Sequence, residues 1–124
     1  MKSREGLLRL KRFQVEEKRR QVAQIEAMIA EFDRMAKELN DQVLAEQERS
    51  GIHDAGHFAY PTFAKAATQR RDNLAASERA LTDQLAAAKL GFDEAIAELE
   101  KAEAIVERDQ ANDKHAHKPA EAHA

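Results

Sequence analysis

The chain has no cysteine, no tryptophan, two prolines and four glycines among its 124 residues. The lack of cysteine excludes a disulfide-stapled module, a thiol-dependent enzyme and a cysteine-ligated zinc finger. The scarcity of proline and glycine excludes a collagen-like or proline-rich chain. No apolar run is long enough for a secretory signal or a membrane span, so we expect a cytoplasmic protein without a transmembrane segment.

Charged residues, by contrast, make up 35% of the sequence, and the uncharged remainder is rich in alanine and leucine. This composition is typical of long helices and coiled coils. The formal net charge is only −3, so the overall balance indicates neither a nucleic-acid-binding protein nor an acidic tail. The length suits one small domain.

Two stretches have the heptad spacing of apolar residues that is typical of coiled-coil helices. The first extends from about residue 2 to residue 49, and its main apolar series is Leu8, Val15, Val22, Ile29, Ala36 and Val43. The second extends from about residue 61 to residue 108 and is rich in alanine. Its one weak point is Gly91, because glycine disfavours a helix by roughly 1 kcal/mol relative to alanine.

Residues 50–60 are expected to form the connecting loop. Gly51 suits a left-handed residue just past a helix end, and Pro61 suits the first position of the next helix. Residues 111–124 show no periodicity and contain Pro119, so we expect a disordered tail there. The predicted fold class is all-α, a long two-helix antiparallel coiled-coil hairpin over residues 1–110 with a short loop and a disordered C-terminal tail.

Charge favours an antiparallel hairpin over a parallel or homodimeric coiled coil. Residues 1–20 carry a net charge of +5, and residues 91–110, which face them in a hairpin, carry −5. Lys11 and Lys18 occupy seam positions where an apolar residue is usual. A turn centred near residues 55–56 places these two lysines opposite Glu100 and Asp93.

No catalytic or cofactor motif is present, and a two-helix hairpin offers no concave pocket for a substrate. We therefore expect neither an enzyme nor a cofactor. His53 and His57 have the spacing of a helical metal site, and His115 and His117 form a short H-x-H. Neither pair has the further ligands that a metal site needs, so we interpret all four as loop and tail residues.

Two groups of residues are candidates for binding a protein partner. The first is the basic N-terminal segment, with Arg4, Arg9, Arg12, Arg19 and Arg20. It has only Phe13 for stacking on bases and few large apolar residues for a membrane surface, so pairing with the acidic second helix explains it better than nucleic acid or lipid. The second group surrounds the turn and consists of Phe58, Tyr60, Phe63 and Arg71. Its aromatic side chains serve either as a small cap core or as exposed anchors for a partner.

Residues 7–26 (LLRLKRFQVEEKRRQVAQIE) and 58–74 (FAYPTFAKAATQRRDNL) resemble the FliJ family of flagellar export proteins, in its alphaproteobacterial form. The resemblance extends over about residues 1–110. It implies an antiparallel coiled coil similar to the central shaft of rotary ATP synthases. It also implies a place in the flagellar type III export apparatus, at the cytoplasmic face of the inner membrane, with peripheral membrane association through partners.

The resemblance further implies three partners: the hexameric export ATPase, the cytoplasmic domain of the membrane export gate, and export chaperones. By analogy, the paired chain ends with their five arginines enter the ATPase ring. The turn, with its aromatic residues and Arg71, then faces the gate. The alternative is a generic self-associating coiled-coil scaffold or chaperone.

Overall fold

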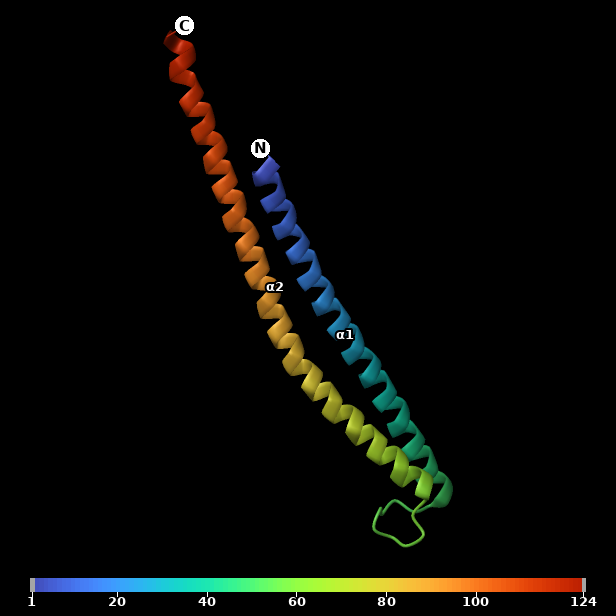
Figure 1. The fold of residues 1–124 in the computed structure, drawn as a ribbon. Helices are drawn as coiled ribbons and strands as arrows, with labels where there is room; N and C mark the ends of the chain where they lie inside the picture. Colours follow the sequence, from blue (N-terminus) through green and yellow to red (C-terminus); the bar gives the residue numbers. More distant parts are fainter. Residues whose placement is uncertain (1, 124) are drawn as a thin grey trace. The chain divides into compact units, whose positions relative to one another are not determined.

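The chain folds into two long helices joined by one loop, as the computed structural model shows (Figure 1). Helix α1 extends over Lys2–Ser50 and helix α2 over Thr62–His123. The structure describes the backbone of residues 2–123 and the side chains of residues 3–114. The predicted fold class, an all-α helical hairpin, is confirmed.

Packing divides the chain into two units, each of which pairs a segment of α1 with a segment of α2. The turn unit is residues 23–87, and the terminal unit is residues 1–22 together with residues 88–124. In the turn unit the loop joins the two helical segments directly (Figure 1). In the terminal unit Arg4 reaches Asp113 while Lys11 reaches Glu98, so the segments run antiparallel.

The seam between the helices buries few and mostly small side chains. Among the described residues, the buried apolar side chains are Val43, Ala64, Ala67, Leu81, Ala102 and Val106. Three of the six are alanines, and no large side chain in this part of the chain is completely buried. Because hydrophobic stabilisation scales with the apolar area removed from water, each unit gains little from its own core.

The best-packed cluster lies next to the loop. Val43 from α1 packs with Ala64 and Ala67 from α2, and the partly buried Leu39 and Tyr60 complete the cluster. The small alanines allow the first turns of α2 to lie close to α1. This cluster fixes the ends of both helices at the loop.

The helix ends at the loop follow the sequence signals closely. Gly51 has a φ of 73°, and its amide donates to the carbonyl of Gln47 at 2.9 Å, so it is the left-handed residue that ends α1. The carbonyl of Pro61 accepts from the amide of Lys65 at 3.1 Å, which makes Pro61 the cap immediately before α2. The loop is therefore residues 51–61, one residue later than predicted.

Helix α2 does not stop near residue 108. It continues to His123, through the segment for which we predicted a disordered tail. Extending an existing helix adds one hydrogen bond per residue without a new nucleation cost, and Asp113 gains an ion pair with Arg4. Pro119 removes one amide donor without ending the helix.

Candidate partner-binding surfaces

The loop is tied down by short-range hydrogen bonds. The amides of His57 and Tyr60 donate to the carbonyls of Asp54 and His57, both at 3.0 Å, which closes two consecutive turns. The carboxylate of Asp54 accepts from the amide of Gly56 at 2.9 Å. These bonds form turns, and they give the loop a defined backbone path.

The three aromatic residues near the turn have different environments. Phe58 is 97% exposed and stacks on His57 with the ring centroids 4.7 Å apart. Tyr60 is half-buried against the Val43 cluster, and its hydroxyl accepts from the amide nitrogen of Gln47 at 3.0 Å. Phe63 is 56% exposed on the first turn of α2. Tyr60 thus closes the hairpin, whereas Phe58 and Phe63 are available to a partner.

Arg71 is a structural residue of the turn unit. Its Nη1 donates to the side-chain oxygen of Asn40 on α1 at 2.7 Å, and its Nε and Nη2 reach Asp72 at 3.3 and 3.2 Å. The bond to Asn40 crosses between the helices at a half-buried seam position. Arg71 therefore has less free hydrogen-bonding capacity than its place near the turn suggests.

In the terminal unit, basic side chains of α1 meet acidic side chains of α2. Arg4 contacts Asp113 at 2.5 Å, and Arg12 contacts Glu103 at 3.9 Å. The side chain of Arg4 is only 20% exposed, whereas that of Arg12 is 60% exposed. The opposite charges of the two segments therefore meet as predicted. Arg4 pairs with α2 within the hairpin and is less accessible to a partner than Arg12.

The register of the seam lysines differs from the prediction. Lys11 pairs with Glu98 at 3.8 Å rather than with Glu100. Lys18 forms no ion pair with Asp93 among the side chains of residues 3–114. Instead its aliphatic chain lies over Gly91, where an added Cβ is 3.7 Å from the Lys18 Cδ. The missing side chain of Gly91 leaves space that the long lysine occupies.

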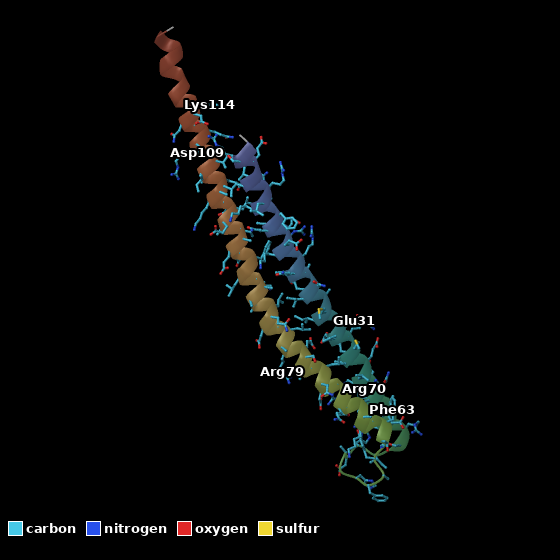
Figure 2. All side chains as sticks on the ribbon, in the orientation of Figure 1. Glu31, Phe63, Arg70, Arg79, Asp109 and Lys114 are labelled. Atoms are coloured by element: carbon cyan, nitrogen blue, oxygen red, sulfur yellow. The ribbon has the colours of Figure 1, made fainter. Side chains whose placement is uncertain are left out.

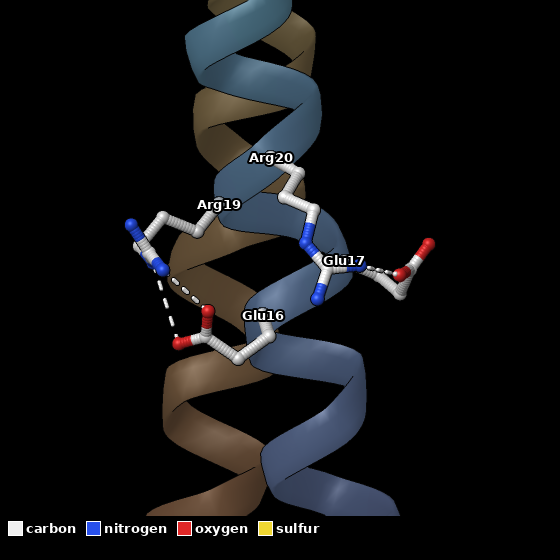
Figure 3. Close-up of polar contacts among 4 residues, drawn as sticks. All are labelled: Glu16, Glu17, Arg19 and Arg20. Atoms are coloured by element: carbon white, nitrogen blue, oxygen red, sulfur yellow. Dashed lines mark hydrogen bonds and ion pairs between the residues drawn. The ribbon is translucent and has the colours of Figure 1, made fainter.

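Arg19 and Arg20 pair within their own helix (Figure 3). Arg19 binds Glu16, and Arg20 binds Glu17 at 2.6 Å, both across three residues of α1. The hydrogen bond from Arg19 lowers the pKa of the Glu16 carboxyl. Both arginines remain exposed, and so does Arg9, which takes no part in the ion pairs of the described side chains.

The histidines near the loop do not form a metal site. The ring nitrogen Nδ1 of His57 accepts from the amide of Ala59 at 3.0 Å, so His57 serves the turn. Within the described part of the chain, no three histidine, aspartate or glutamate side chains come together as metal ligands. His115 and His117 lie outside the described side chains.

A groove on the surface of the turn unit was not among the sites predicted from the sequence. It has a volume of about 430 Å³. Its lining residues come from both helices and are Phe32, Met35, Glu38, Leu39, Gln42, Arg70, Asn73, Leu74 and Ser77. A smaller hollow containing Phe63 and Ala66 shares Leu39, Gln42 and Arg70 with it, so the two are continuous.

Figure 2 labels Phe63 and Arg70 on this stretch of α2. We call this surface the methionine groove.

Comparisons with protein-family models, curated proteins and solved structures give no match. The resemblance of residues 7–26 and 58–74 to the FliJ family therefore stays a hypothesis. No described helix has the length and apolar character needed to cross a membrane.

The sequence did contain a signal for the methionine groove. Met28, Met35 and Gln42 recur at seven-residue intervals beside the seam of α1, at positions where two-stranded coiled coils usually carry charge. Neither the volume nor the α2 lining of the groove follows from that pattern alone.

Proposed function

We propose that this chain is a non-enzymatic coiled-coil component of the bacterial flagellar type III protein export apparatus. In this role it is a stalk that couples the export ATPase ring to the membrane export gate and to export chaperones. It acts at the cytoplasmic face of the inner membrane and reaches the membrane only through these partners. It binds partner proteins and carries out no chemistry itself.

The observation that supports this proposal most strongly is the exposed aromatic side chain on a defined loop. Phe58 is 97% exposed, although the backbone on both sides of it is held by hydrogen bonds. Exposed aromatic anchors on a pre-organised backbone are typical of protein interfaces, because little conformational entropy is lost when they bind.

The terminal unit supports a second contact of a different chemical kind. Arg9, Arg12, Arg19 and Arg20 are exposed along one helical segment, although three of them also contact carboxylates. Exposed ion pairs of this kind are weak, so an acidic partner surface can exchange with them. A hexameric ATPase that presents carboxylates towards its centre suits such a segment.

The first test is genetic and enzymatic. Deleting the gene in the bacterium that encodes this chain is expected to abolish swimming and the export of flagellar proteins. Adding the purified chain to that bacterium's flagellar export ATPase is expected to raise the rate of ATP hydrolysis. Normal swimming in the deletion strain together with an unchanged ATPase rate refutes the proposal.

The second test separates the two contacts with matched variants. Phe58→Ala is expected to weaken binding to the export gate domain at least tenfold, a loss of about 1.4 kcal/mol. Phe13→Ala is the control, since Phe13 is 57% exposed but lies in the terminal unit. Arg9→Glu is expected to reduce ATPase stimulation, whereas Lys89→Glu, an exposed cation on α2 of the same unit, leaves it unchanged. Equal effects within either pair contradict the assignment of that contact.

A generic self-associating coiled-coil scaffold or chaperone is the second candidate. The methionine groove favours it, because this groove leaves apolar side chains of the hairpin uncovered. Under this alternative the chain has no effect on a flagellar ATPase, and deleting its gene leaves swimming intact.

A further inference from the structure

In the turn unit, the position of α1 that borders the seam on one flank carries no charge in three successive heptads. Met28, Met35 and Gln42 lie there at successive heptads, whereas the opposite flank carries Glu26 and Asp33. A two-stranded coiled coil needs only two apolar positions per heptad and usually has charged flanks. With the methionines included, this part of α1 has three apolar positions per heptad, which is typical of a helix in a larger bundle.

The α2 side of the methionine groove also suits a second layer of helices. Ala66, Asn73 and Ser77 are short side chains at spacings of seven and four residues, and they let another helix approach closely. The exposed ring of Phe63 stands at the loop end of this stretch (Figure 2). Arg70 is the only charged residue that α2 contributes to the groove.

The turn unit has only a small core of its own, so covering the groove with further helices would add to its apolar burial. Its buried apolar residues are Val43, Ala64, Ala67 and Leu81. Met28 and Met35 remain 42% and 36% exposed, so a partner that covers the groove removes large apolar side chains from water.

The charges at the groove indicate what the partner is. α1 contributes Glu38, whose side chain is 59% exposed and pairs with Arg34 of the same helix at 2.6 Å, and α2 contributes Arg70. When two copies face each other about a twofold axis parallel to the helices, α1 of each copy lies against α2 of the other. Glu38 then meets Arg70 of the second copy, and symmetry makes this contact twice. A twofold axis perpendicular to the helices instead places α1 against α1 and α2 against α2, so Glu38 then does not meet Arg70 of the second copy.

We propose that the methionine groove is the interface through which two copies of this chain pair. The pair forms a four-helix layer over the turn unit, with its twofold axis parallel to the helices. Met35 and Phe63 become buried at the centre and end of the interface, and Glu38 and Arg70 form reciprocal ion pairs at its rim. This inference does not depend on a role in flagellar export, since it concerns the purified chain alone.

The first experiment measures the mass of the full chain by sedimentation over a range of concentrations. The unaltered chain is expected to be a dimer at micromolar concentration, and Met35→Lys is expected to weaken the dimer at least tenfold. Leu44→Lys is the matched control, because Leu44 is 52% exposed and lies nine residues away, on the opposite side of α1. Far-UV circular dichroism checks that both variants keep their helices.

The second experiment uses charge exchange to show that the contact is between chains. E38R and R70E chains each place like charges together twice in their own dimers, so each is expected to dimerise more weakly than the unaltered chain. Mixing them is expected to give a heterodimer tighter than either homodimer, because one contact is native and the other has both charges exchanged.

Three results overturn the proposal. One is a monomer at every concentration, which leaves the groove to a different protein. Another is an equal effect of Met35→Lys and Leu44→Lys on dimerisation. The third is a mixture of E38R and R70E chains that associates no better than the separate chains. None of these results bears on the ATPase or swimming tests of the proposed function.

Discussion

Two glycines of this hairpin are expected to respond in opposite ways to replacement by alanine. Gly91 lies inside α2 and faces the aliphatic part of Lys18, and a Cβ added there meets the Lys18 Cδ at an ordinary contact distance of 3.7 Å. Gly91→Ala is therefore expected to stabilise the fold by about 0.5–1 kcal/mol, since alanine removes the helix penalty of glycine without a clash. Thermal and urea unfolding followed by circular dichroism measure the change.

Gly51→Ala is the matched control and is expected to act in the opposite direction. Gly51 has a φ of 73°, which costs an alanine roughly 1 kcal/mol or more, although no atom lies within 4 Å of the added Cβ. A loss of stability in the Gly91→Ala variant would mean that the Lys18 chain packs more tightly on this seam than the structure indicates.

At the scale of the helix, α1 contains a repeated pattern of ion pairs. Arg19, Arg34 and Arg49 each bind the glutamate three residues before them, and hydrogen bonding lowers the pKa of these three carboxyls, Glu16, Glu31 and Glu46. A carboxyl whose pKa is lower in the folded chain stabilises it above its unfolded pKa of about 4.3, and this contribution is lost as the pH falls through the folded pKa. Helicity and melting temperature are thus expected to be lower at about pH 3 than at about pH 7.

A triple variant with Glu16, Glu31 and Glu46 changed to Gln tests the origin of this pH dependence. It is expected to lose part of the pH dependence, and high salt is expected to weaken the same pairs in the unaltered chain because they are exposed. The control changes Glu48, Glu94 and Glu100 to Gln, three exposed glutamates outside the ion pairs of the described side chains. The same pH dependence in both triple variants contradicts the assignment.

The elements were predictable because heptad spacing and turn chemistry are local properties of the sequence. Gly51 ends α1 as its left-handed preference predicts, and the loop is shifted by only one residue. Pairing between the helices was less predictable. A long lysine reaches along the partner helix, so Lys11 selects Glu98 instead of Glu100, and Lys18 lies over Gly91. The sequence analysis also ended α2 too early. The ion pair between Arg4 and Asp113 joins residues that are 109 positions apart, and local sequence patterns do not show such a contact.

The candidate surfaces were predictable by residue type but not by exposure. Phe58 and Tyr60 are two residues apart in the sequence, yet one is exposed and the other packs on the Val43 cluster. The difference arises from the two turns of the loop, whose hydrogen bonds direct the neighbouring side chains differently. The methionine groove is lined by side chains of both helices. The methionines of α1 therefore indicate its apolar flank, whereas its α2 wall follows only from the way the helices pack.

At the scale of the whole chain, the two units differ in what holds them together. Of the six buried apolar residues among the described side chains, the turn unit contains four, and a short loop closes its pair of helices. The terminal unit joins segments separated by residues 23–87. In its described part it relies on two buried apolar residues and on partly exposed ion pairs such as Arg12–Glu103. Exposed ion pairs contribute only about 0–1 kcal/mol each, whereas local contacts cost less closure entropy.

The terminal unit is therefore expected to open before the turn unit. In hydrogen exchange, the amides near Val43 and Ala64 are expected to exchange most slowly, and those near Arg12 and Glu103 markedly faster. Raising the salt concentration is expected to accelerate exchange in the terminal unit more than in the turn unit, because it screens the ion pairs and leaves apolar burial intact. Uniform protection along both helices, unchanged by salt, would show that the hairpin opens as one cooperative unit and that its ion pairs do not determine where opening starts.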